Sequence, residues 1–279
     1  MATLSTYLAE VRRLLHDANA NFWTDADLTT YINEARARVV RDTGCLRTLQ
    51  QTYSPLAPSG VAATAWSAGA VVAVNNYIYY NIYIYQVTVG GVLGTTAPPY
   101  PDGVSATPPS AAFANGTATI KYVQNAEIIP FSSLPQGAAT LDILNVTLYW
   151  GNSRIPLRYM PWTQFNSDLR YWQNYMGRPI AFSVYGQAQI YIAPIPDQTY
   201  SIEIDSVVLP TDLVLTSDVD TIMEPYNRPV SFYAAHKAKY QEQSYGEAEI
   251  FKQEYIKHVS SVLNSVYTRR IPNPYSTPY

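Results

Sequence analysis

Residues 17–44 read DANANFWTDADLTTYINEARARVVRDTG, and this stretch has the pattern of a turn followed by a helix. Thr24 stands where a helix would begin, and its side chain can accept a hydrogen bond from a free backbone N–H group. Apolar residues then recur every three or four positions and form one face. They are Leu28, Tyr31, Ile32, Ala35 and Val39. Gly44 ends the pattern, so we predict a capped amphipathic helix whose apolar face needs a partner.

Two further features of this stretch support expectations about individual side chains. Phe22 precedes the cap and is expected to pack on Leu28 as a hydrophobic staple. Arg36, Arg38 and Arg41 place positive charge toward the C-terminal end of the helix, where it suits the helix dipole.

Helices are also predicted at both ends of the chain. Leu4, Leu8, Val11 and Leu15 recur at helical spacing after a possible cap at Thr3 or Ser5. Near the other end, Pro229 suits a first helical position, and an apolar stripe follows it to residue 266. Residues 244–246 either divide this stretch into two helices or kink one. Because each stripe needs a partner, the terminal helices are expected to form one bundle.

The middle of the chain has the pattern of a β protein. Proline and glycine separate short runs of β-branched and aromatic residues. The predicted strands are 46–53, 140–149, 180–185, 189–192 and 200–209, and residues 163–175 are predicted as a short helix.

Residues 63–123 differ from their surroundings because they contain only two charged residues, Asp102 and Lys121. Short Val-, Ile- and Tyr-rich runs alternate there with turn candidates at Asn75, Asn76 and Asn81. We predict a small β-module inserted into a host domain, and an α+β fold for the whole chain. The expected divisions are 1–45 (N-terminal helices), 46–62 with 124–228 (β-rich region), 63–123 (inserted module), 229–266 (C-terminal helices) and 267–279 (extended arm).

The composition points to extensive contact with partners. Charged residues make up only 14% of the 279 residues, against about 25% in an average domain. The chain has 25 tyrosines, and Tyr is enriched at interfaces, although a Tyr-rich β-sheet protein would show the same count. A net charge of −3 argues against a protein that grips nucleic-acid phosphates, but it allows DNA to pass without specific binding.

Residues 1–15 contain Glu10, Arg12 and Arg13 and therefore do not resemble a signal peptide. No apolar stretch is long enough to span a membrane, so synthesis in the cytoplasm and no membrane association are expected.

The sequence offers little catalytic chemistry. His16, His236 and His258 are far apart, and Cys45 is the single cysteine, so neither a metal site nor another cofactor is expected. Asp218 and Asp220 are the best candidates for an acid–base pair, but solvated turn residues ahead of the last helices would look the same. We therefore expect a protein without catalytic residues that is not an enzyme.

Three stretches together resemble the head-to-tail adaptors (connectors or gatekeepers) of tailed phages. The first is residues 17–44, which contain the pattern Leu-x-x-Tyr-Ile-Asn-Glu-Ala from Leu28. The second is residues 177–210, with a Pro-x-Pro-Asp turn from Pro194 between two strands, and the third is residues 224–241. Their order and spacing, rather than any one motif, carry the resemblance.

This resemblance implies a structural virion protein at the head–tail junction. Such adaptors form a ring, usually of twelve copies, beneath the portal protein and contact tail nozzle, hub or fibre proteins around the DNA channel. The arm would bind the portal or a neighbouring copy through Tyr267, Arg269, Arg270, Tyr275 and Tyr279; a disordered tail is the alternative.

The inserted module resembles the small carbohydrate-binding-like modules of phage tail proteins and chitinases. That likeness makes Trp66, Tyr79 and Tyr83 candidates for stacking on a glycan or for contact with the tail. Two other functions therefore remain open: a virion-associated cell-wall hydrolase that uses Asp218 and Asp220, and a host-glycan-binding tail subunit that uses the module.

Overall fold

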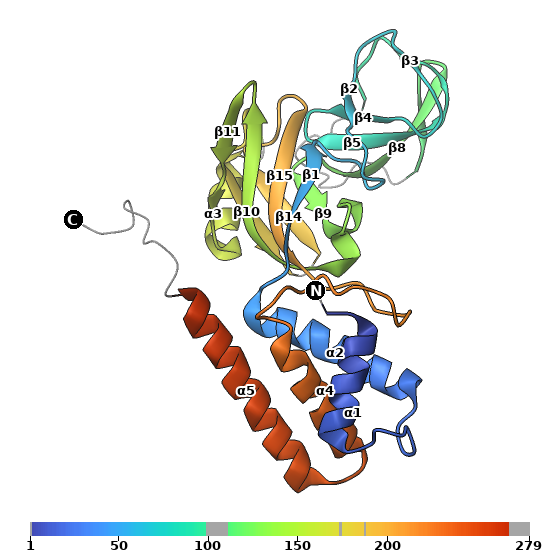
Figure 1. Cartoon of the computed structure of the whole chain (residues 1–279). Helices are drawn as coiled ribbons and strands as arrows, with labels where there is room; N and C mark the ends of the chain where they lie inside the picture. Colours follow the sequence, from blue (N-terminus) through green and yellow to red (C-terminus); the bar gives the residue numbers. More distant parts are fainter. Residues whose placement is uncertain (1, 99–110, 173–174, 187, 268–279) are drawn as a thin grey trace, which may run out of the picture. The chain divides into compact units, whose positions relative to one another are not determined.

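A computed structural model describes residues 2–98, 111–172, 175–186 and 188–267 (Figure 1). The chain has the predicted α+β fold with a β-rich middle. It divides into two compact units: a helical unit of Met1–Arg47 with Val207–Tyr279, and a β unit of Thr48–Ser206.

The helical unit joins helices from both ends of the sequence, as predicted. They are α1 (Leu4–Leu15), α2 (Asp25–Thr43), α4 (Arg228–Gln241) and α5 (Tyr245–Tyr267). The α4 helix contacts each of the other three, and buried apolar residues of all four form one core (Figure 1). The break between α4 and α5 shows that the C-terminal stretch is two helices rather than one kinked helix.

The predicted caps of the first two helices are confirmed. The Thr3 hydroxyl accepts a hydrogen bond from the backbone N–H of Thr6 at 3.3 Å. Thr24 does the same for Asp27 at 3.1 Å, and Gly44 ends α2 with a left-handed φ of 61°. Local sequence therefore sets where these helices begin and where α2 ends.

The predicted staple by Phe22 is wrong, because this side chain is 85% exposed. Trp23 is the residue directly before the cap, and its ring packs edge-on against Tyr31, with ring centroids 6.0 Å apart. Asp17 holds the turn between α1 and α2, since its carboxylate accepts backbone N–H groups on that turn and an Arg12 N–H at 3.2 Å.

The β unit contains two four-stranded sheets that share one core, and we call this pair of sheets the sandwich. The first has the order β1-β15-β10-β11, and the second has the order β12-β13-β14-β9. Their bounds are β1 Arg47–Ser54, β9 Ile128–Pro130, β10 Thr140–Trp150, β11 Ser153–Pro156, β12 Arg158–Tyr159, β13 Ala181–Tyr185, β14 Gln189–Ala193 and β15 Tyr200–Val208. Apolar residues of both sheets, such as Val146 and Ile190, meet in the core. All five predicted strands of this region are present.

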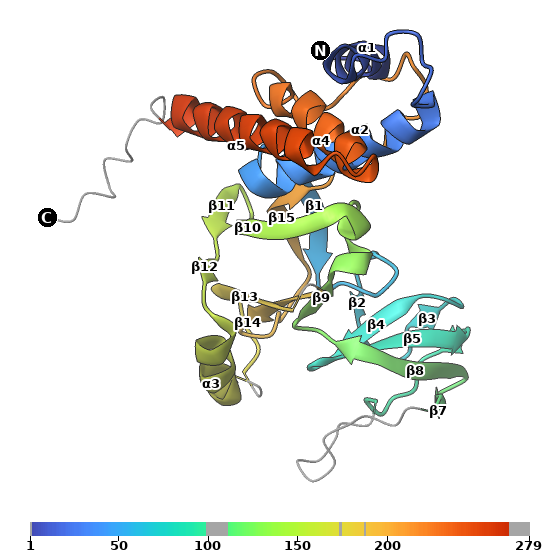
Figure 2. The same cartoon turned by 90° about the horizontal axis from the view of Figure 1, so that it is seen from below.

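Helical turns cover parts of these sheets. The predicted short helix is α3 (Trp162–Trp172), and Phe165 on it packs against Ala181 and Ala193 of β13 and β14 (Figure 2). Two 3₁₀ turns, η1 (Phe131–Ser133) and η2 (Gly137–Ala139), precede β10.

The inserted module forms its own five-stranded sheet, β2-β4-β5-β8-β7, and a two-stranded pair, β3-β6. The bounds are β2 Thr64–Ala65, β3 Val71–Val72, β4 Tyr77–Tyr80, β5 Tyr83–Val89, β6 Gly91–Val92, β7 Phe113–Asn115 and β8 Ala118–Asn125. Asn75 and Asn81 adopt left-handed backbone conformations at turns, as their residue type predicts.

The module joins the sandwich through adjacent pieces of backbone. The Ala63 N–H donates to the carbonyl oxygen of Pro55 at 3.2 Å, where the chain enters. The Gln124 side chain donates to the carbonyl oxygen of Leu56 at 2.6 Å, where the chain leaves. A small apolar cluster that includes Ile84 and Ile195 packs the module against the sandwich.

Candidate functional site

A buried ion pair lies at the centre of the helical unit. The Nη2 atom of Arg36 on α2 is 2.7 Å from Oδ1 of Asp220, in the segment that leads into α4. Both side chains are fully buried, at 1% and 0% exposed. Arg36 also donates from Nη1 to the carbonyl oxygen of Thr211 at 2.8 Å. The pair therefore ties the segment before α4 to α2 at two points.

Other polar groups complete this buried network. The Tyr7 hydroxyl of α1 donates to Oδ2 of Asp220, and the Ile222 N–H donates to Oδ1 at 3.0 Å. Burial, reinforced by the hydrogen bond to Asp220, raises the pKa of Tyr7. Asn33 accepts the Leu213 N–H and donates to its carbonyl oxygen, both at 3.0 Å. Hydrogen bonds and the ion pair thus connect α1, α2 and the segment before α4, which are separate parts of the sequence.

The structure corrects the reading of Asp220 as a solvated turn residue. Asp220 is 1% exposed and is neutralised by Arg36. Asp218 accepts the backbone N–H groups of Val214 and Leu215, each at 2.8 Å, and these bonds lower its pKa. Both carboxylates hold the segment in place, and they do not form an accessible acid–base pair. That geometry gives no support to the hydrolase alternative.

Arg36 is the residue of this buried network that the sequence reasoning misplaced. Its charge suggested a position near the helix end that suits the dipole, whereas it lies inside the core. The sequence contained a signal, since Arg36 is four residues after Ile32 and three before Val39 and therefore shares the apolar face.

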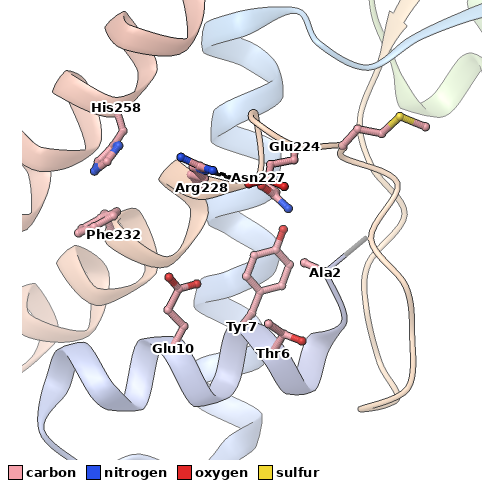
Figure 3. Close-up of a pocket in the computed structure, with 10 residues that line it drawn as sticks. Ala2, Thr6, Tyr7, Glu10, Glu224, Asn227, Arg228, Phe232 and His258 are labelled. Carbon is pink, nitrogen blue, oxygen red and sulfur yellow. Dashed lines mark hydrogen bonds and ion pairs between the residues drawn. The ribbon is translucent and has the colours of Figure 1, made fainter.

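A cavity of about 690 Å³ opens beside this network, between α1, α4 and α5 (Figure 3). Tyr7 and Glu10 reach it from α1, Phe232 from α4 and His258 from α5. The rings of Phe232 and His258 are stacked, with centroids 4.7 Å apart and planes 21° apart. This stacked pair forms one aromatic side of the cavity.

The cavity has acidic groups in two distinct states. Glu224 is held by Arg228 at 2.6 Å, in an exposed pair. Glu10 accepts a hydrogen bond from the Ser231 hydroxyl at 2.7 Å, and no cation of the described chain contacts it. In Figure 3 its carboxylate points toward the space between the helices.

The histidines are not gathered into a site. His16 ends α1 in a left-handed conformation, and the Nδ1 atom of His236 lies 2.8 Å from the carbonyl oxygen of Ala248. Within the described ranges, no three His, Cys, Asp or Glu side chains are placed to hold a metal ion. Cys45 is half-buried against the helical core, and burial raises the pKa of its thiol.

The three glycan candidates of the inserted module do not form an exposed platform. Tyr79 and Tyr83 are each only 7% exposed. Trp66 is half-buried, packs edge-on against Tyr80 at 5.5 Å and donates to Asn115 at 3.3 Å. Burial leaves the faces of the two tyrosine rings inaccessible to a sugar, which argues against a stacking role for them.

Tyr267, one of the five residues predicted for the portal or neighbour interface, is the last residue of α5. Arg269, Arg270, Tyr275 and Tyr279 lie outside the described residues.

Large apolar side chains are exposed on the helical unit. Four of them lie in the segment before α4: Val214, Leu215, Val219 and Met223, each more than half exposed. Ile250 and Ile256 are similarly exposed on α5. Apolar surface of this kind is typical of subunit contacts.

Comparison with known protein families decides the identity. The family model described as SU10 adaptor protein matches residues 114–277, which is more than half of the chain. The chain belongs to the SU10 adaptor family. This places it among phage adaptor structural proteins, which are virion components whose role implies contact with portal and tail proteins.

The SU10 adaptor match covers β8 of the inserted module, strands β9 to β15 of the two four-stranded sheets, and helices α3, α4 and α5. It includes two of the three stretches that suggested an adaptor, and it leaves out residues 17–44 and most of the inserted module. Comparison with curated proteins gives no match. Among the described residues, no helix is long and apolar enough to cross a bilayer.

Proposed function

We propose that this SU10 adaptor is the subunit of a ring, of twelve copies, that docks under the portal and connects it to the tail. Membership of the adaptor family carries the proposal. The ring surrounds the channel through which DNA leaves the head. DNA passes it without specific binding, consistent with a net charge of −3.

The helical unit supplies surfaces suited to packing between copies. Val214, Leu215 and Met223 expose more than 60% of their area in the segment before α4. The buried Arg36–Asp220 pair anchors this segment, so its apolar side chains are presented by a fixed backbone. Rigid apolar surface loses little entropy on association, which favours assembly.

The C-terminal arm provides a second contact. Its Arg and Tyr residues, from Tyr267 to Tyr279, are of the types that dominate interface energetics, and we assign them to the portal or to a neighbouring copy. The inserted module, with its low charge, is assigned to contact with tail proteins.

Co-sedimentation with the purified portal ring tests the proposal. The full chain and a chain truncated after Tyr267 are each spun with and without the portal. We expect the full chain to pellet with the ring and the truncated chain to stay in the supernatant. The adaptor assignment is abandoned if neither chain binds, and the role of the arm is abandoned if both bind equally.

A further inference from the structure

The cavity between α1, α4 and α5 combines the volume of a ligand site with a lining of aromatic and acidic side chains. Its volume of about 690 Å³ is within the ~300–1,000 Å³ of typical ligand sites. The stacked rings of Phe232 and His258 form one aromatic side of it, and Tyr7 lines it from α1 (Figure 3). The lining thus offers apolar contact on one side and a carboxylate on the other.

The carboxylate of Glu10 distinguishes this pocket from an ordinary surface depression. Its described partner is the neutral hydroxyl of Ser231, whereas the nearby Glu224 already has Arg228. A half-buried carboxylate without a cation is a favourable place for an incoming guanidinium, because Arg forms short, charge-assisted hydrogen bonds to carboxylates.

The complementary chemistry is found at the end of this same chain. Residues 268–279 read TRRIPNPYSTPY and contain two arginines, three prolines, two tyrosines and no acidic residue. Proline-rich segments favour the extended polyproline conformation and dock into aromatic-lined grooves. Arg269 or Arg270 can meet Glu10 while the following Pro and Tyr rings contact the stacked Phe232–His258 pair.

We propose that this pocket receives residues 268–279 of a neighbouring copy. The inference rests on the proposed ring, in which copies lie side by side. A segment of this length spans at most about 40 Å, and the pocket residue His258 lies only about 13 Å before the end of α5. To fill its own pocket the segment must reverse direction sharply, which a stiff proline-rich chain resists. Exchange between copies would link each subunit to the next.

Peptide binding tests the chemistry of the pocket. The probe is a fluorescent peptide of residues 268–279, titrated into the chain truncated after Tyr267. We expect saturable binding that Glu10→Lys weakens by about tenfold or more, since the charge pair becomes repulsive. Glu249→Lys is the matched control, because Glu249 is an exposed glutamate on α5 outside the pocket, and it should change affinity by less than about twofold.

A peptide of reversed charge serves as a control, because its binding would show that the Glu10→Lys chain is folded. The Glu10→Lys chain should recover affinity for a peptide in which Arg269 and Arg270 are both replaced by glutamate. Absence of binding at millimolar peptide, or equal effects of Glu10→Lys and Glu249→Lys, would overturn the assignment.

A mixing experiment tests whether the segment comes from a neighbour. Full-length Glu10→Lys has residues 268–279 but a blocked pocket. The chain truncated after Tyr267 has an open pocket but lacks residues 268–279. We expect the mixture, but neither protein alone, to form a one-to-one complex in sedimentation. If the full-length wild-type chain stays monomeric and does not bind the peptide, its own arm fills the pocket. That result would overturn the proposed exchange between copies.

The portal assay separates this inference from the proposed function. If full-length Glu10→Lys and wild type form equally stable rings on the portal, the pocket assignment fails and the adaptor role stands. If neither joins the portal, the proposed function itself fails.

Discussion

Arg36 and Asp220 are 184 residues apart in the sequence, yet their side chains form a doubly hydrogen-bonded ion pair inside the helical unit. The Nε and Nη2 atoms of Arg36 lie 3.0 and 2.7 Å from Oδ1 of Asp220. Because α4 begins at Arg228, this contact fixes the approach to α4 against α2. The pair therefore aligns the N-terminal and C-terminal halves of the bundle.

Replacing Asp220 by alanine should destabilise the helical unit strongly. It leaves the Arg36 guanidinium buried without its counter-charge, which costs about 3–5 kcal/mol. Chemical denaturation followed by circular dichroism measures the loss. Glu224→Ala is the control, because it breaks the exposed pair with Arg228 and should cost less than about 1 kcal/mol. Similar losses in the two variants would show that the buried pair contributes no more to the free energy of unfolding than the exposed pair does.

Replacing both partners of the buried pair gives a different expectation. Arg36→Met combined with Asp220→Leu removes both charges, so the double variant should be more stable than Asp220→Ala alone. A double variant that is less stable than Asp220→Ala would mean that the hydrogen bonds to Thr211 and Ile222 matter more than the ion pair.

Stability should fall at alkaline pH because a buried tyrosine resists ionisation. Burial, with a hydrogen bond to Asp197, raises the pKa of Tyr200 from 10.0 to about 12. Between these values the unfolded chain loses the proton while the folded chain keeps it, so the free energy of unfolding decreases as pH rises through this window and is unaffected below it. Denaturant titrations at pH 8 and pH 11 measure the difference in the free energy of unfolding. The higher pH lies about 1 unit above the ordinary tyrosine pKa.

The tyrosine prediction has a matched pair of variants. Tyr200→Phe should reduce the alkaline loss of stability, and Tyr245→Phe, which alters a ring that is 58% exposed, should leave it unchanged. An unchanged slope in Tyr200→Phe would assign the effect to other groups.

Gly116→Ala should disrupt the inserted module. Gly116 has a φ of 72°, and an added Cβ would lie 2.3 Å from the carbonyl oxygen of Val92. Gly69 has a similar φ of 75° but open space around it, so Gly69→Ala should cost only the ~1–2 kcal/mol of left-handed strain. Amide hydrogen exchange over strands β2 to β8 should therefore accelerate far more in Gly116→Ala. Equal exchange in the two variants would contradict the steric argument.

Trp66→Ala should act on the stability of the module rather than on glycan recognition. The variant loses the contact with Tyr80 and the hydrogen bond to Asn115. Because Trp66 is half-buried, we expect a loss of roughly 2 kcal/mol, below the ~3–5 kcal/mol of a fully buried tryptophan. Thermal unfolding and a glycan array are measured together. Wild-type glycan binding that disappears in a stable Trp66→Ala variant would support the glycan alternative.

Local signals explain why much of the fold was predictable. Thr24 and Gly44 set the ends of α2 through hydrogen bonds and backbone geometry within a few residues. Alternating residues in 200–209 predicted β15, and Asn81 predicted the turn between β4 and β5. Each of these features depends on neighbours in sequence, so pattern reasoning reaches it.

Long-range pairing explains what was missed. Asp220 appeared to be a turn residue because its partner, Arg36, is near the other end of the chain. The burial of Tyr79 depends on packing of the module against Ile195, which no local pattern contains. The order of strands in each sheet is likewise set by contacts between distant segments.

The attachment of the inserted module bears on how such adaptors can evolve. Pro55 and Leu56, where the chain departs from the sandwich, are bonded to Ala63 and Gln124 at the base of the module. A short turn can bridge ends that lie this close, and the entropy of closing a loop rises only slowly with its length. Genetic recombination between these points would exchange the whole appendage and leave the sandwich strands paired. A phage lineage could thus acquire a new module in a single crossover event.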